Sequence, residues 1–105
     1  MTSIRITHRP LLFLSETHAW KGPTPGSKES PEEEVMRLIS GVKPRKDGSK
    51  EVNLTAAQRA ILADYIDVFA IGAADNAGPW DTDATADLNS ARALLRQIAR
   101  LKETP

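Results

Sequence analysis

The sequence predicts a mainly α-helical small domain of three helices, built on an antiparallel helical hairpin and preceded by an extended N-terminal arm. Two capping-box motifs precede apolar segments, apolar residues recur at helical spacing in the second half of the chain, and 105 residues suit a single fold unit. Short connections between helices favour antiparallel neighbours. We expect residues 1–30 to form the arm and a Pro/Gly linker, and residues 31–105 to form the helical domain.

The first thirty residues are typical of an arm. Ile4 and Ile6 alternate with polar residues, which is typical of a strand, and Pro10 interrupts the alternation. A short β-strand or a β-hairpin is therefore an option for this segment. Residues 21–31 hold three prolines, two glycines and no large apolar side chain, so we expect a linker there. The apolar run Leu11–Leu14 has to dock against another surface.

The first expected helix spans residues 31–40. Ser30 is a good N-cap, and Glu33 stands three residues later, which completes a capping box. The following residues 42–53 are polar. Within them Asp47-Gly48 favours a tight turn, and both a small hairpin and a loop are compatible with the composition.

The second expected helix spans about residues 55–73, and its start again carries a capping box, formed by Thr55 and Gln58. At 100° per residue, a wide sector collects the apolar residues Ile61, Leu62, Tyr65, Ile66, Val68 and Phe69. The polar residues Arg59, Asp64 and Asp67 lie outside it. We therefore expect that sector to be the buried face.

The third expected helix spans residues 83–102. Gly78-Pro79 breaks the preceding helix, and Asp81, Thr82 or Asp83 can cap the next one. A helical stripe follows, made of Leu88, Ala91, Leu94, Leu95, Ile98 and Leu101. The short connection favours antiparallel packing of the last two helices.

Charge is balanced overall but arranged in blocks. Fourteen Lys and Arg residues match fourteen Asp and Glu residues. Residues 60–91 carry six Asp and no basic residue, whereas residues 35–59 carry six basic and two acidic residues. Net charge therefore favours neither nucleic acid nor a membrane as a partner.

The residue types exclude many kinds of chemistry. The chain has no cysteine, and its two histidines, His8 and His18, both lie in the arm. No zinc-binding histidine pair, phosphate-binding glycine loop or nucleophile motif is present. The alternating Asp81, Asp83 and Asp87 lack the glycine and glutamate that a calcium loop requires. We therefore expect no enzyme, no cofactor and no metal.

The leading hypothesis is a non-enzymatic protein–protein interaction module: a small accessory, adaptor, inhibitor or assembly subunit in the cytoplasm. Its partner is expected to be another protein, or a second copy of the chain in a homodimer. Tryptophan and arginine are enriched where interfaces gain most of their energy, and three arginines recur every four residues near the end of the chain. The expected partner-binding residues are Leu11, Leu12, Phe13, Trp20, Trp80, Arg92, Arg96 and Arg100.

The alternative hypothesis is a nucleic-acid-binding protein. It would use the basic segment 43–50 together with the three arginines of the last helix. The cations of that segment are Lys43, Arg45, Lys46 and Lys50, and no aromatic residue lies among them to stack on bases. No membrane partner is expected, because no apolar run approaches the roughly 20 residues of a membrane-spanning helix.

Overall fold

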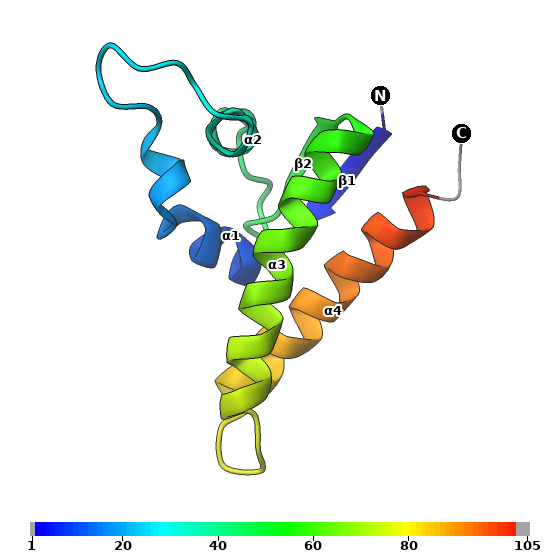
Figure 1. The fold of residues 1–105 in the computed structure, drawn as a ribbon. Helices are drawn as coiled ribbons and strands as arrows, with labels where there is room; N and C mark the ends of the chain where they lie inside the picture. Colours follow the sequence, from blue (N-terminus) through cyan, green and yellow to red (C-terminus); the bar gives the residue numbers. More distant parts are fainter. Residues whose placement is uncertain (1, 103–105) are drawn as a thin grey trace.

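The computed structural model describes residues 2–102, which form a mainly helical fold with one small sheet (Figure 1). The elements in chain order are β1 (Thr2–Ile6), α1 (His8–Ser15), the 3-10 helix η1 (His18–Lys21), α2 (Pro31–Ser40), β2 (Lys50–Leu54), α3 (Ala56–Asn76) and α4 (Thr82–Lys102). The predicted mainly α class is confirmed, and the structure adds a helix and a sheet to the three expected helices. Residue 1 of the expected arm and residues 103–105 of the expected helical domain lie outside the described residues.

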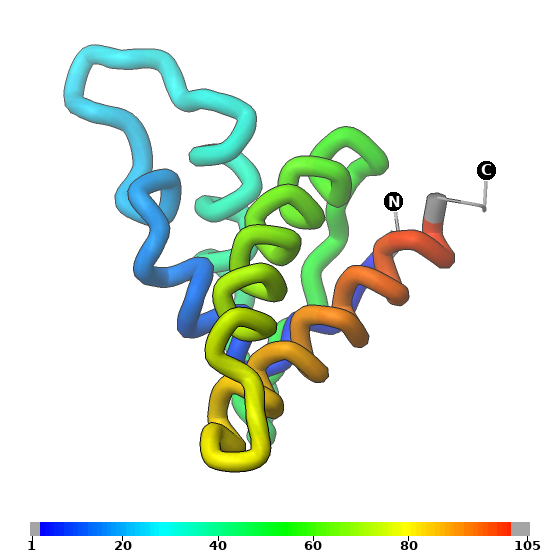
Figure 2. The backbone as a smooth tube through the Cα atoms, turned by 60° about the horizontal axis from the view of Figure 1, so that its bottom comes forward, coloured from blue at the N-terminus to red at the C-terminus, as the bar shows by residue number. Residues whose placement is uncertain are grey.

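The arm is mostly folded rather than extended. Residues 8–15 form α1 although Pro10 lies among them, because a proline in the first turn of a helix gives up no hydrogen bond. The expectation of an extended arm is therefore wrong for α1 and η1, whereas the optional strand is confirmed as β1. Of the expected linker, residues 22–30 contain no helix or strand and loop away from the body, whereas Lys21 belongs to η1 and Pro31 to α2 (Figure 2).

The sheet joins the start of the chain to its middle. β1 pairs antiparallel with β2, with Ile4 opposite Val52 and Arg5 opposite Glu51. Ile4 and Val52 are buried, whereas Arg5 and Glu51 are exposed, so one face of the sheet contacts the helices and the other faces solvent. Neither of the options expected for residues 42–53 included this pairing, because its partner strand lies far away in the sequence.

The outer edge of β1 is bound by α4. The side chain of Gln97 accepts a hydrogen bond from the N–H of Arg5 at 2.7 Å and donates one to the Arg5 carbonyl at 3.0 Å. One amide group thus satisfies both the backbone N–H and the backbone carbonyl of Arg5 on the side of β1 away from β2. This arrangement covers part of a strand edge that would otherwise be open to pairing with another chain.

The core lies between the sheet and the helices. α3 and α4 meet at the loop 77–81 and diverge from there, while β1 contacts α4 and β2 contacts α3 (Figure 2). The most completely buried side chains come from nearly every element and include Ile4, Ile6, Leu14, Val35, Met36, Ile39, Leu54, Leu62, Ile66, Ala91 and Ile98.

The helix starts follow the capping motifs. The Ser30 hydroxyl accepts a hydrogen bond from the Glu33 N–H at 3.2 Å, and the Glu33 carboxylate accepts one from the Ser30 N–H at 2.7 Å. The hydrogen bonds that the Glu33 carboxylate accepts from Ser30, first of all the one from the Ser30 N–H, lower the pKa of Glu33. Thr55 begins α3 with the same reciprocal pair. Asp81 caps α4, because its carboxylate accepts from the Ala84 N–H at 2.9 Å.

The buried side of α3 differs from the expected one. Leu62 and Ile66 are buried, as expected, but Val68 is 62% exposed. Arg59, which the spacing placed outside the buried sector, is only 8% exposed. Its guanidinium donates to the Leu54 carbonyl at 2.8 Å, and this bond ties α3 to the end of β2. α3 is apolar on nearly every side, so spacing alone could not select the side that contacts the core.

Arg59→Ala should lower the free energy of unfolding by about 2–3 kcal/mol, because the variant loses a charged hydrogen bond and the packing of a buried aliphatic stem. Urea denaturation of both proteins measures the difference. Arg92→Ala, at an exposed position of α4, is the matched control and should change the value by less than about 0.5 kcal/mol. Equal small effects of the two substitutions would contradict a structural role for Arg59.

Candidate functional site

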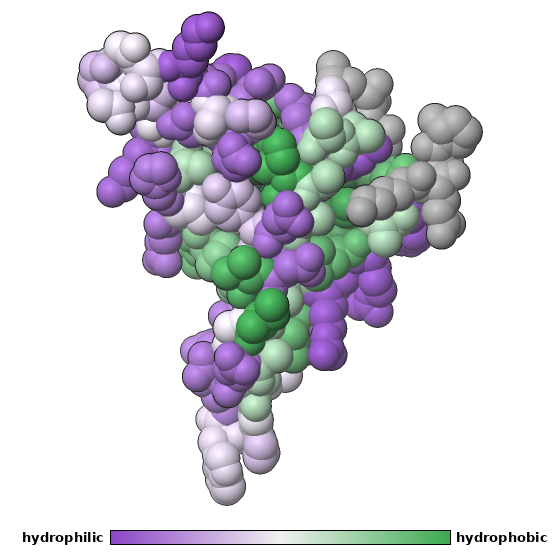
Figure 3. All heavy atoms as spheres, in the orientation of Figure 1, coloured by the Kyte–Doolittle hydropathy of each residue, from purple (hydrophilic) through white to green (hydrophobic). Residues whose placement is uncertain are grey.

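Large hydrophobic side chains are exposed mainly on the hairpin of α3 and α4. Among residues 2–102 four such side chains are exposed, and three of them belong to the hairpin. Val68 and Ile71, on α3, are 62% and 65% exposed, and Trp80, in the loop at the hairpin tip, is 95% exposed. The fourth is Leu12 of α1. Figure 3 shows hydrophobic atoms gathered over the middle of α3. Contiguous exposed apolar surface of this kind marks interaction sites.

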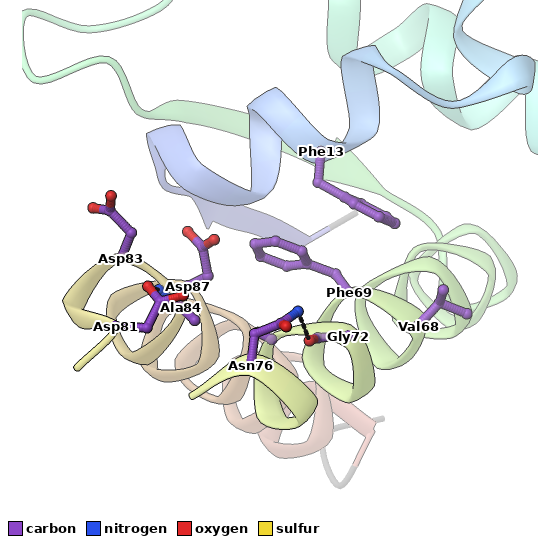
Figure 4. A pocket seen from close by; sticks show the side chains of 10 residues that line it. Phe13, Val68, Phe69, Gly72, Asn76, Asp81, Asp83, Ala84 and Asp87 are labelled. Atoms are coloured by element: carbon purple, nitrogen blue, oxygen red, sulfur yellow. Dashed lines mark hydrogen bonds between the residues drawn. The ribbon is translucent and has the colours of Figure 1, made fainter. Parts of the chain in front are cut away.

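Three open depressions, each lined in part by α3, share lining residues. The central one, of about 380 Å³, is lined by Phe13, Val68 and Phe69 together with polar residues of the hairpin (Figure 4). A second, of about 390 Å³, shares Phe13 and Phe69 and extends to Leu12. A third, of about 270 Å³, shares Val68 and extends to Tyr65. We call the three together the α3 groove, and its apolar floor is formed by Leu12, Phe13, Ile61, Tyr65, Val68 and Phe69.

Aromatic rings form the centre of this floor. The rings of Phe13 and Phe69 are stacked, with centroids 4.9 Å apart and planes inclined by 29°, and Figure 4 shows them lying against each other. Since Phe13 belongs to α1 and Phe69 to α3, the pair also fixes α1 on the hairpin. Burial, followed by the charges of Glu32 and Glu33, raises the pKa of Tyr65, so its phenol stays protonated at neutral pH.

The rim of the α3 groove is strongly acidic. Six carboxylates line it: Glu16, Glu32, Asp64, Asp81, Asp83 and Asp87. Among the described residues, Arg9 is the one cation of the lining, and it lies 3.0 Å from Asp87 and 3.5 Å from Asp83; these contacts raise the pKa of Arg9. Six carboxylates against one guanidinium leave a formal charge of −5 around the groove. An apolar floor with such a rim suits a ligand that is both cationic and apolar.

The expected partner-binding residues of the first twenty positions divide between core and groove. Leu11 is buried in the core, whereas Leu12 and Phe13 line the α3 groove. Trp20 is half-buried, and the Lys50 ammonium lies 5.8 Å from its ring centroid, so this tryptophan already has partners inside the chain.

Val68 was expected in the core but is exposed in the α3 groove, whereas Phe69 lines the groove and also packs against the core. The apolar sector predicted for their helix was very wide, and this width is the signal that could have identified them. A helix contacting a core on one side needs a narrower stripe.

The three arginines of α4, which we call the arginine stripe, are exposed. Arg92, Arg96 and Arg100 take part in none of the ion pairs found among residues 2–102. An open depression of about 570 Å³ is lined by Arg96 and Arg100 together with Ala93 and Ala99. The stripe is therefore available to a partner.

The basic segment 43–50, expected to bind nucleic acid in the alternative hypothesis, is partly occupied by contacts within the chain. Arg45 forms an ion pair with Glu51 at 2.8 Å. The Lys50 ammonium donates to the carbonyl of Ile39 at 3.0 Å, near the end of α2. Lys43 and Lys46 are exposed, so two of the four expected cations remain for a polyanion.

The turn that leads into β2 is held by Asp47. Its carboxylate accepts from the Ser49 hydroxyl at 2.6 Å and from the Ser49 N–H at 2.9 Å, and it also pairs with the Arg5 guanidinium. These hydrogen bonds lower the pKa of Asp47 to about 2. Ser49 is itself buried, so this small network fixes the turn against β1.

Comparisons with known proteins add no family to this description. The chain matches no protein-family model, and neither a curated protein sequence nor a solved structure matches it significantly. Within residues 2–102, no group of three or more histidine or carboxylate side chains could hold a metal ion. The same range contains no helix of the length and apolar character required to cross a bilayer.

Asp47→Asn should make the protein less sensitive to acid. The pKa of Asp47 in the folded state, about 2, is below its ordinary value of 3.8, so its stabilisation is complete above about pH 5 and is lost as the pH falls towards 2. Urea midpoints at about pH 6 and about pH 2.5 measure this change. The original protein should lose more stability between the two than the variant. Equal losses would show that Asp47 contributes nothing to the acid response.

Val68→Ser should change the free energy of unfolding by less than about 0.5 kcal/mol, because the side chain is mostly in water. Ile66→Ala, two residues away on the buried side of the same helix, should cost about 2–5 kcal/mol. Thermal or urea denaturation compares them. A large decrease in the free energy of unfolding for Val68→Ser would show that Val68 is buried in the core, as its spacing predicted.

Proposed function

We propose that this chain is a non-enzymatic interaction module whose α3 groove binds a cationic, amphipathic segment of a partner protein. Such a module acts as a small accessory, adaptor, inhibitor or assembly subunit. The observation that carries the proposal is the groove itself: an apolar floor open to solvent, with six carboxylates and one arginine around it.

The apolar floor supplies the affinity in this proposal. Covering the exposed part of Val68 stabilises a complex by about 1–2 kcal/mol. Trp80 at the hairpin tip adds a large side chain of the type that most often dominates interface energies. Water-exposed side chains of this size are therefore the first positions at which substitution should weaken binding.

The acidic rim of the α3 groove selects partners by charge. Opposite charges across an interface accelerate association and reject partners of the wrong sign more than they add affinity. The aromatic rings of Phe13, Tyr65 and Phe69 favour cationic side chains as well, since guanidinium and ammonium groups are attracted to ring faces. A segment that mixes arginine or lysine with apolar residues satisfies both parts of the groove.

Quantitative capture from a lysate of the source cells tests this proposal. The bait proteins are the original chain, a groove variant carrying Asp64→Lys and Val68→Ser, and the matched control Asn53→Ala on the solvent face of the sheet. A fourth bait carries Lys43→Glu and Lys46→Glu. Each lysate is divided, and one half is treated with nuclease before capture and mass spectrometry.

The expected result is a protein retained in stoichiometric amounts by the original chain, the control and the Lys43/Lys46 variant. The groove variant should retain it at least about tenfold less, equivalent to about 1.4 kcal/mol. Equal retention by the groove variant would reject the groove as the binding site. Retention that nuclease abolishes, together with loss in the Lys43/Lys46 variant, would instead favour nucleic-acid binding.

A further inference from the structure

The chain itself carries a surface of the kind that the α3 groove suits. We propose that the arginine stripe of one copy docks into the α3 groove of a second copy, so that the chain associates head to tail with itself. This inference rests on the proposed function, because it names the partner of the same groove.

The arginine stripe has the length and composition of a cationic ligand. Its members lie four residues apart on α4, so their Cα atoms follow each other at about 6 Å and the stripe extends for about 12 Å. All three side chains are exposed, and none forms an ion pair among residues 2–102. Ala93 and Ala99 beside them are small, which allows a partner surface to approach the helix closely.

The α3 groove offers what a guanidinium needs. Planar guanidinium groups stack on aromatic rings and bind carboxylates through two parallel hydrogen bonds. The floor supplies the rings of Phe13, Tyr65 and Phe69. The rim carboxylates Glu16 and Asp64 form no ion pair within residues 2–102, so both can accept a cation from outside.

The charges and side chains of the two surfaces favour a second copy over a polyanion as the occupant. The chain is neutral overall, and the −5 rim of the groove lies on the same small molecule as the stripe, which opposes the approach of a phosphate backbone. The residues beside the arginines are alanines rather than aromatic side chains that could stack on bases. Stripe and groove thus complement each other in charge.

The contact joins two different surfaces. The depression at the stripe and those of the groove share no lining residue. A head-to-tail contact of this kind leaves one groove and one stripe free at the ends of every assembly, so association continues as concentration rises unless a ring closes.

Analytical ultracentrifugation of the full chain tests the inference through complementation. A stripe variant carries Arg92→Glu and Arg96→Glu, and a groove variant carries Glu16→Lys and Asp64→Lys. A charge-matched control carries Lys43→Glu and Lys46→Glu. Circular dichroism confirms that each variant is folded before it is used.

The original chain and the control should exceed the monomer mass increasingly with concentration at about 0.1 M NaCl, and less so at about 1 M, where the screening length falls to about 3 Å. Each reversed variant alone should associate at least about tenfold more weakly. Their equimolar mixture should recover association, because the intact groove of the stripe variant can bind the intact stripe of the groove variant.

A chain that stays monomeric at all concentrations, or two variants that fail to pair when mixed, would overturn the inference. In that case, loss of a foreign partner in the groove variant alone would leave the proposed function standing. Binding of a single-stranded oligonucleotide that the stripe variant loses, in the absence of self-association, would assign the stripe to polyanions and would equally overturn it.

Discussion

The pairing of β1 with β2 is the constraint on which the rest of the fold depends. It closes a long stretch of chain, and the entropy lost in that closure is offset only because Ile4, Val52 and Leu54 become buried together. With the sheet between the diverging ends of α3 and α4, α3 is contacted by α4, α2, α1 and β2, and these elements cover its buried side. Val68 and Ile71 remain exposed, and Val68 lines the α3 groove.

Local sequence motifs predicted three of the helices. The sheet, which they did not predict, depends on contacts between residues far apart in the sequence. Capping at Ser30, Thr55 and Asp81 involves groups within one helical turn, so the residues themselves specify it. The sheet was missed because β1 pairs with a strand far away in the sequence. Only two side chains of β2 are buried, which is too short an alternation to identify the strand. α1 was missed because Pro10 suggests an interruption, whereas the first turn of a helix accepts it.

The candidate site shows the same division. Trp80 and the three arginines of α4 are exposed, and their role in partner binding stays a prediction. Leu11 and Trp20 have the same chemical character as Leu12 and Trp80, yet the fold uses them internally. The apolar character of a side chain determines how much burial stabilises it, but only the tertiary structure determines which element buries it.

The two hydrogen bonds between the Gln97 side chain and the Arg5 backbone also determine which parts of the chain lie at each end of the molecule. They hold the first strand beside the last helix, so β1 begins and α4 ends at one pole, while the hairpin tip forms the opposite pole (Figure 1). The loop 77–81, which carries the exposed Trp80, therefore lies at the pole opposite to the start of β1 and the end of α4.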